Sequence, residues 1–353
     1  MWQVENQTPF AVERGWVRDR DGAEVWIVAA KCTFDISPKG HTSLAEQQPP
    51  VLRVPAYFAA PGKSSIKYEA DLVLGKQTTD IIVVGHAYAP GGRPVRQLEV
   101  GFRVGHVRKT LMVFGKRRWQ AGGVGKPEPF DTMPLVYERA FGGVDGDSAQ
   151  PDTDWDWRNP VGTGFAVEEK HLDGRSLPNL EYPDALIRSW KDRPAPAGFG
   201  VIAGHWQPRV ALAGTYDERW QATRLPLLPD DFDIRFHQCA PADQQAAAFL
   251  QGGESAALLN LTPEGNLSFD LPRVRPDFET HFYDGTRQLH DAPQLHTVII
   301  EPDHPRVSLV WHSALRCHAK VHWLDRTIVR VPDLGIDGDV LVDPVGQERL
   351  GHG

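Results

Sequence analysis

Between positions 24 and 36 every second residue of this chain is apolar, and this alternation restricts the folds that it can adopt. Side chains alternate across an extended strand, so one face would carry Trp26, Val28, Ala30, Cys32, Phe34 and Ile36. The same period of two recurs over residues 98–104 and 109–113, on either side of Gly105-His106. Glycine in the first of two turn positions suits a type II′ turn, which closes a β-hairpin. These segments predict antiparallel β-structure.

Further short apolar or alternating segments predict more strands of the same kind. They lie at residues 79–88, 258–261, 267–271, 280–283, 286–289, 295–301 and 307–312. The 29 prolines and 33 glycines also favour many short strands joined by tight turns, and residues 37–61 are proline-rich and polar enough to predict a long loop. We therefore expect a mainly β protein with antiparallel sheets, arranged as a sandwich or as two β-rich lobes, and with a few short helices.

Three helices are expected in the middle of the chain. One would begin at Asp131 or Thr132, with Pro134 in its first turn, and end at Gly142-Gly143. Tyr137 and Phe141 stand four residues apart, so they would face the same way on that helix. Residues 217–224 and 241–250 predict two more, and the second of these carries the clearest helix pattern, with proline early and a glycine pair after it.

The chain divides by pattern into three ranges. Residues 1–125 are expected to form an N-terminal β-rich lobe, residues 126–255 a central segment of short helices and loops, and residues 256–353 a C-terminal β-rich segment. No low-complexity linker separates the ranges, so one continuous domain is equally compatible with the pattern.

Charge and cysteine content limit the partners and the compartment. The net charge of −8 argues against nucleic acid or an anionic membrane as the main partner. The basic run at residues 116–119 is interpreted as a solvated strand end, in preference to a binding patch. The chain start lacks the basic and apolar regions of a signal peptide, no apolar run reaches transmembrane length, and the three cysteines lie far apart. These features predict a protein of the reducing cytoplasm.

Two patterns, one of histidines and one of aspartates, are candidate metal sites. His318 and His322 would lie on one face of a predicted strand, but Arg316 and Lys320 share that face and would repel a cation. Asp152, Asp154 and Asp156 alternate like the start of a calcium loop. The sixth and twelfth positions of such a loop should be glycine and glutamate, whereas this chain has Trp157 and Thr163 there. We expect no metal, no cofactor and no catalytic residue.

Several longer motifs are similar to one protein family. YERAFGGVD at 137–145, NPVGTGF at 159–165, LPNLEYP at 177–183, PAGFGVI at 196–202, AGTYDERW at 213–220 and LPLLPDDFDIRFHQCAPADQQ at 225–245 occur in this order. With YEADLVLGKQTTDIIVVGHAYAP at 68–90, they resemble the domain-of-unknown-function 2169 family of bacterial proteins, over most of the chain.

This resemblance implies an accessory protein of type VI secretion, which acts as an adaptor or chaperone. Such a protein binds a toxic effector and helps load it onto the spike of the secretion machine, a VgrG trimer with a PAAR-type cap. The resemblance implies no catalysis. It assigns no binding residue. We name Tyr137, Glu138, Arg139 and Phe141 as candidate partner contacts, although the two aromatic residues could equally be core and the charged residues a solvated pair.

Trp155 and Trp157 are further candidate contacts, because aromatic anchors within a polar rim are a common arrangement in protein interfaces. A second hypothesis uses the same residues differently. Trp155, Trp157, Trp190 and Trp206 could line a sugar platform in a β-sandwich enzyme or carbohydrate-binding protein, with carboxylates as acid and base. A weaker third hypothesis is a structural subunit of a larger assembly.

Overall fold

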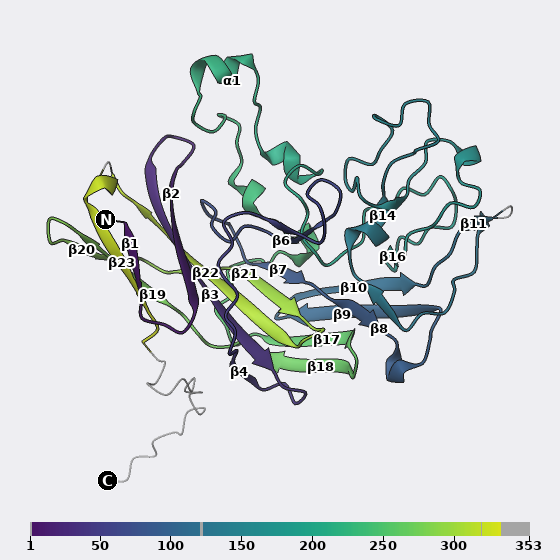
Figure 1. The fold of residues 1–353 in the computed structure, drawn as a ribbon, viewed down its shortest axis with the longest axis horizontal. Helices are drawn as coiled ribbons and strands as arrows, with labels where there is room; N and C mark the ends of the chain where they lie inside the picture. Colours follow the sequence, from purple (N-terminus) through teal and green to yellow (C-terminus); the bar gives the residue numbers. More distant parts are fainter. Residues whose placement is uncertain (1, 121–122, 319, 333–353) are drawn as a thin grey trace, which may run out of the picture.

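The computed structural model describes residues 2–120, 123–318 and 320–332 of the chain. Strands make up 38% of it and helical turns 9%, so the predicted mainly β fold with antiparallel sheets and few short helices is confirmed. In Figure 1 the strands form layers across the lower part of the molecule, whereas the loop-rich central range and helix α1 (Glu218–Thr223) lie above and beside them.

The largest sheet has six strands and contains the alternating segment near the N-terminus. Its order is β2 (Ala11–Arg18), β3 (Glu24–Ile36), β22 (Arg306–Arg316), β21 (Gln294–Glu301) and β7 (Asp80–Val83), with β4 (Thr42–Leu44) paired to β3. All of these pairs are antiparallel except that of β21 with β7. The sheet therefore joins both ends of the chain, since β3 pairs with β22 along eleven residues.

Two further sheets pack near this one. The five-stranded sheet has the order β16 (Leu180–Glu181), β10 (Val107–Phe114), β9 (Gln97–Val104), β17 (Ser255–Thr262) and β18 (Gly265–Asp270). The four-stranded sheet has the order β1 (Gln3–Asn6), β23 (Leu324–Arg330), β19 (Asp277–Phe282) and β20 (Arg287–Leu289). The hairpin predicted at Gly105-His106 is present as β9–β10, and Gly105 has a φ of 55°. The strands predicted at 258–261 and 267–271, and those at 280–283 and 286–289, form the further hairpins β17–β18 and β19–β20.

Short strand pairs and single helical turns complete the structure. The pairs are β5 (Ala56–Tyr57) with β6 (Ile66–Tyr68), β8 (His86–Tyr88) with β13 (Thr132–Pro134), β11 (Trp119–Gln120) with β12 (Gly123–Val124), and β14 (Phe141–Gly142) with β15 (Thr163–Gly164). Single 3₁₀ turns occur at Pro90–Gly92, Tyr137–Arg139, Glu169–His171, Arg209–Leu212, Ile234–His237, Ala242–Gln244 and Val321–Trp323.

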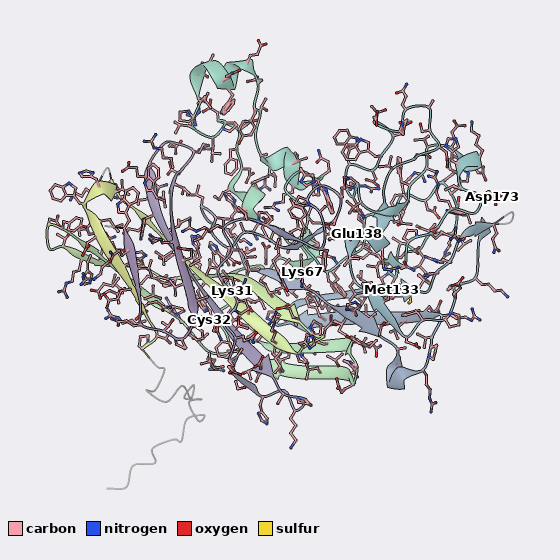
Figure 2. All side chains as sticks on the ribbon, in the orientation of Figure 1. Lys31, Cys32, Lys67, Met133, Glu138 and Asp173 are labelled. Carbon is pink, nitrogen blue, oxygen red and sulfur yellow. The ribbon has the colours of Figure 1, made fainter. Side chains whose placement is uncertain are left out.

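One face of β3 contributes to two hydrophobic clusters, and this explains its alternation. Cys32, Phe34 and Ile36 lie in the main core with residues of the five-stranded sheet and of the central range. Trp26 and Val28 lie in a second cluster with residues of the four-stranded sheet. All the alternating residues from Trp26 to Ile36 are at most 5% exposed, as predicted. Cys32 is labelled within this region in Figure 2.

The main core draws on all three sequence ranges. It includes Phe34 and Ile82 from the first range, Tyr137 and Phe199 from the second, and Trp311 from the third. A third, smaller cluster belongs to the loop-rich part and contains Trp119, Phe141, Ala166, Leu172, Leu177 and Ile187. The three ranges distinguished by their sequence patterns therefore share one hydrophobic core.

Helix α1 is confirmed, with Asp217 as its N-cap, whose side chain accepts from the amide of Trp220, but the helix predicted over residues 241–250 is wrong. Residues 241–250 form only a single turn, Ala242–Gln244. The reason is tertiary: the Gln244 side chain donates to the carbonyls of Ile81 (2.7 Å) and Phe199 (2.9 Å), and the amide of Ala246 donates to the carbonyl of Thr79 (2.9 Å). Hydrogen bonds from this segment to the backbone of β7 and of the residue before it take the place of the bonds that a helix would form.

The strand predicted to carry His318 and His322 is also wrong. β22 ends at Arg316, His318 has a φ of 46°, and His322 lies in the 3₁₀ turn Val321–Trp323. Among the described residues, no group of three or more His, Cys, Asp or Glu side chains is arranged to hold a metal ion. No helix in the described ranges combines the length and apolar character needed to cross a bilayer.

Candidate partner-binding site

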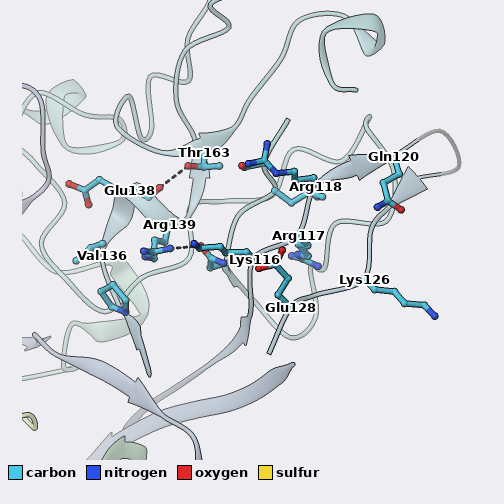
Figure 3. Close-up of a pocket in the computed structure, with 14 residues that line it drawn as sticks. Lys116, Arg117, Arg118, Gln120, Lys126, Glu128, Val136, Glu138, Arg139 and Thr163 are labelled. Atoms are coloured by element: carbon cyan, nitrogen blue, oxygen red, sulfur yellow. Dashed lines mark hydrogen bonds between the residues drawn. The ribbon is translucent and has the colours of Figure 1, made fainter. Parts of the chain in front are cut away.

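A polar cavity opens where the loop-rich part meets the five-stranded sheet (Figure 3). Its volume is about 760 Å³. We call it the basic cavity, and its lining consists of Lys116, Arg117, Arg118, Gln120, Lys126, Glu128, Pro134, Val136, Glu138, Arg139, Thr163, Ser176, Leu177 and Asn179. Two of the residues predicted as partner contacts, Glu138 and Arg139, therefore line the same cavity as the basic run after β10.

The segment that places Glu138 and Arg139 is extended, and the helix predicted over residues 132–142 is wrong. Strand β13 pairs with β8, so Pro134 lies opposite His86, and the amide of Leu135 donates to the carbonyl of Gly85 (3.0 Å). A single turn, Tyr137–Arg139, follows, and β14 comes next. Pairing with β8 supplies the hydrogen bonds that a two-turn helix would have made internally, because a helix that short is marginal by itself.

The glycine pair that was expected to end a helix instead allows two backbones to approach closely. Gly143 has a φ of 95°, and a Cβ atom at this position would lie 2.3 Å from the carbonyl oxygen of Gly162. A Cβ atom at Gly142 would lie 2.3 Å from the carbonyl oxygen of Asn159. The side chain of Asn159 donates to the carbonyls of Tyr137 (2.8 Å) and Phe141 (3.1 Å), so this contact fixes the turn that carries Glu138 and Arg139.

The buried guanidinium of Arg117 forms part of the cavity wall. It donates to the carboxylate of Glu181 and to the carbonyl of Pro178 (3.1 Å), and its Cζ atom lies 3.8 Å from the centre of the Phe114 ring. Burial raises the pKa of Glu181, and burial lowers the pKa of Arg117. Arginine nevertheless stays protonated in proteins, so Arg117 and Glu181 offset each other and add little net charge to the cavity.

Glu138 and Arg139 are each held by a different partner and do not pair with each other. The carboxylate of Glu138 accepts hydrogen bonds from the amide (2.7 Å) and the hydroxyl (2.8 Å) of Ser65. Nη1 of Arg139 donates to Oδ1 of Asn179 (2.9 Å). Figure 3 shows the Glu138 carboxylate turned away from the basic side chains. Glu138 lies at the junction with the sheets, whereas Asp173 marks the far end of the loop-rich part (Figure 2).

The basic character of the cavity comes from four other side chains. Lys116, Arg118 and Lys126 are exposed and Arg139 is half-buried. Within the described ranges, none of the four has a carboxylate oxygen within 4.0 Å. The basic run was predicted to be a solvated strand end, but its side chains form the cavity rim, while Arg117 and Trp119 are buried. The positive charge of the run is visible in the sequence. Which distant residues lie opposite the run, and so form a cavity with it, is not.

Trp155 and Trp157 form a close, tilted pair on the loop that follows β14. Their ring centres lie 3.9 Å apart with an angle of 32° between planes, and Trp157 is 57% exposed. The backbone here is tied to its surroundings: the amide of Asp156 donates to the carbonyl of Gly143 (3.0 Å), and the amide of Gln207 donates to the carbonyl of Trp157 (2.9 Å). The loop therefore presents an exposed indole on a fixed backbone.

The three aspartates around the tryptophans do not form a uniformly solvated loop. Asp152 is exposed, Asp154 accepts from the hydroxyl of Ser148, and Asp156 is buried with its carboxylate bonded to Arg158 (2.9 and 2.6 Å). Asp156 therefore serves as an internal anchor of the loop, and the surface beside Trp157 is less acidic than the sequence indicates.

Tyr137 and Phe141 are both 2% exposed, so neither side chain presents a contact surface in this structure. Tyr137 belongs to the main core and meets the Trp206 ring edge-on at 5.7 Å. Phe141 belongs to the third cluster with Trp119, so the two rings do not share one face. Trp206 is 1% exposed, which removes it from any sugar platform with Trp155 and Trp157.

A buried network of titratable groups lies elsewhere, in the core beside β7. Nζ of Lys76 donates to Asp80 (2.5 Å) and lies 3.5 Å from Sγ of Cys239, and burial raises the pKa of that thiol to about 12. The adjacent cavity has a volume of about 10 Å³. A single water needs about 10–15 Å³, so a substrate has no room there. This network joins β7 to the motif at 225–245 and is structural.

Comparison with known proteins identifies the family but no characterised relative. A search of curated proteins and a search of solved structures each found no match. The family model described as "Uncharacterized protein conserved in bacteria (DUF2169)" matches residues 21–312, which include every strand of the two largest sheets except β2, which precedes the match, and the last residues of β22. The chain therefore belongs to the DUF2169 family of bacterial proteins.

Proposed function

We propose that this chain is a non-catalytic adaptor of type VI secretion. It binds a toxic effector in the cytoplasm and helps load it onto the VgrG spike and its PAAR-type cap. The resemblance described above implies this role, and membership of the DUF2169 family supports the resemblance without assigning a function. What the geometry contributes is an exposed aromatic side chain and a polar cavity, both suited to contact with another protein.

The observation that carries the proposal is the exposed indole of Trp157, which packs against Trp155 on a backbone tied to its surroundings. Aromatic side chains dominate the binding energy of many protein interfaces, above all where polar groups surround them. An anchor that is already ordered loses little conformational entropy when a partner binds. The polar surroundings also suit a loader, which must release its cargo after delivery.

The decisive experiment is deletion of the gene in a strain whose secretion machine is active. We expect the effector encoded beside it to fall in cellular level, in secretion, or in both, because an unbound effector would be neither stabilised nor delivered. Complementation with the intact gene should restore both readouts. Unchanged level and unchanged secretion in the deletion strain would reject the adaptor function.

A further inference from the structure

We propose that the basic cavity binds a carboxylate-rich segment of a partner protein. That the ligand belongs to a protein rests on the proposed function. That the ligand is an anion rests on the charged residues of the cavity alone. Four cationic side chains, Lys116, Arg118, Lys126 and Arg139, line one hollow of about 760 Å³.

The charge balance of the cavity favours an anion. Arg117 is offset by Glu181 in the wall, and Glu138 has both carboxylate oxygens engaged by Ser65. Hydrogen bonds from the neutral groups of Ser65 leave Glu138 negatively charged, so Glu138 and Glu128 offset part of the positive charge and the lining keeps a positive excess. The chain as a whole carries a net charge of −8, so this concentration of positive charge is local and opposite in sign to the rest of the protein. A concave site lined by one sign of charge focuses its field on a ligand of the other sign.

The spacing of the cations favours a chain segment over a single small anion. They come from three separate stretches: the run after β10, the residue that follows β12, and the turn Tyr137–Arg139. Two of the guanidinium groups already donate to protein oxygens, Arg118 to the carbonyl of Gly174 (2.9 Å) and Arg139 to Asn179 (2.9 Å). Cations held apart in this way match several carboxylates along an extended segment.

The composition of the lining separates this cavity from an ordinary small-molecule site. Pockets for small ligands of about 300–1,000 Å³ are lined mainly by apolar and aromatic side chains. Here only Pro134, Val136 and Leu177 among the lining residues are apolar. Nucleic acid is also disfavoured, because its phosphates continue beyond the cavity and would meet the acidic remainder of the protein.

The cavity is connected to the exposed tryptophan pair through the backbone. Thr163 lines the cavity and pairs with Phe141, and the carbonyl of Gly143 accepts from the amide of Asp156, which separates the two tryptophans. The loop that carries the tryptophans is therefore held by the same strand pair that contributes Thr163 to the cavity.

The test measures binding of a fluorescein-labelled peptide of alternating Glu and Gly to the full-length protein by fluorescence anisotropy. A peptide in which Lys replaces Glu, inorganic phosphate and a single-stranded oligonucleotide are the competing probes. The variant Lys116→Gln/Arg118→Gln/Lys126→Gln removes three exposed cations. The control variant Lys39→Gln/Lys63→Gln/Lys191→Gln removes the same charge from exposed positions outside the cavity. Thermal melting of both variants checks that each remains folded.

We expect the Glu peptide to bind and the Lys peptide not to bind. Affinity should fall at least about tenfold in the cavity variant, equivalent to about 1.4 kcal/mol, and change little in the control variant. It should also fall as salt rises from about 0.01 M to about 0.1 M, which shortens the Debye length from about 30 Å to about 10 Å.

Three results would overturn the inference: absence of Glu-peptide binding, equal weakening in both variants, or tighter binding of phosphate or the oligonucleotide than of the peptide. The outcome is independent of the deletion experiment. Peptide binding together with unchanged effector secretion would leave the cavity assignment in place and reject the adaptor function. Lost secretion together with no peptide binding would support the adaptor function and reject the cavity assignment.

Discussion

The guanidinium of Arg117 donates a hydrogen bond to the carboxylate of Glu181 in the wall of the basic cavity, and the two side chains are only 4% and 0% exposed. Glu181 also accepts from the amide of Ile187 (2.9 Å), so it joins β16 to the loop-rich part as well as to the basic run. This buried ion pair therefore holds the wall of the cavity together but adds little net charge to it.

Replacing Glu181 by Ala should lower the free energy of unfolding by about 3–5 kcal/mol, because the change leaves Arg117 buried without a counter-charge. Urea denaturation followed by tryptophan fluorescence measures this change. Glu128→Ala is the matched control, since Glu128 is an exposed carboxylate of the same cavity, and its effect should stay within about 0.5 kcal/mol. Similar losses in the two variants would contradict the role given to the pair.

The stacked imidazoles of His296 and His312 should make the fold sensitive to acid. Their ring centres lie 4.2 Å apart, and neither ring nitrogen of His296 has a hydrogen-bond partner within the described ranges. Burial lowers the pKa of His312 to about 3, and burial lowers the pKa of His296 well below its usual range. The unfolded chain binds protons on these groups below about pH 6.5, whereas the folded chain does not.

The free energy of unfolding should therefore be highest above about pH 6.5 and fall as the pH drops towards 4, by up to about 1.4 kcal/mol per pH unit for each histidine. His296→Leu should reduce this slope, because it removes one of the two groups. Denaturation curves at several pH values give the slope directly. The exposed His41→Gln is the control and should leave it unchanged. A slope that is the same in His296→Leu as in the native chain would refute the assignment.

Gly143→Ala should destabilise the loop-rich part by about 2 kcal/mol or more, because the residue has positive φ and its Cβ atom would meet the Gly162 carbonyl. Gly146→Ala is a close control: it lies three residues further on, and its Cβ atom would meet nothing within 4 Å. Thermal unfolding of the two variants compares them. Equal stability would show that the backbone contact at Gly143 can relax at no cost.

Trp157→Ala should leave the fold intact and weaken effector capture by about 2 kcal/mol or more, as expected for an exposed aromatic anchor. Pull-down of the neighbouring effector with tagged variants measures capture, and thermal melting measures stability. Trp323→Ala removes an indole that is 43% exposed at the end of the four-stranded sheet, so it controls for the loss of a surface tryptophan. Capture that falls equally in the two variants would argue against a specific anchor at Trp157.

Local pattern determined much of the sheet structure. The alternation that ends at Ile36, the hairpin at Gly105 and the helix within residues 217–224 depend on residues close together in the sequence, and all were predicted correctly. A strand face and a two-residue turn are both specified by near neighbours.

Tertiary structure decided what local pattern could not. Residues 132–142 and 241–250 carry helix signals, but their backbones pair with β8 and β7, because a strand partner distant in sequence offers hydrogen bonds that outweigh a weak local propensity. The burial of Tyr137 and the exposure of Trp157 follow from packing against segments far away in the chain. The basic cavity exists only because Lys116, Lys126 and Arg139 are brought together by folding, a nonlocal arrangement that no spacing in the sequence encodes.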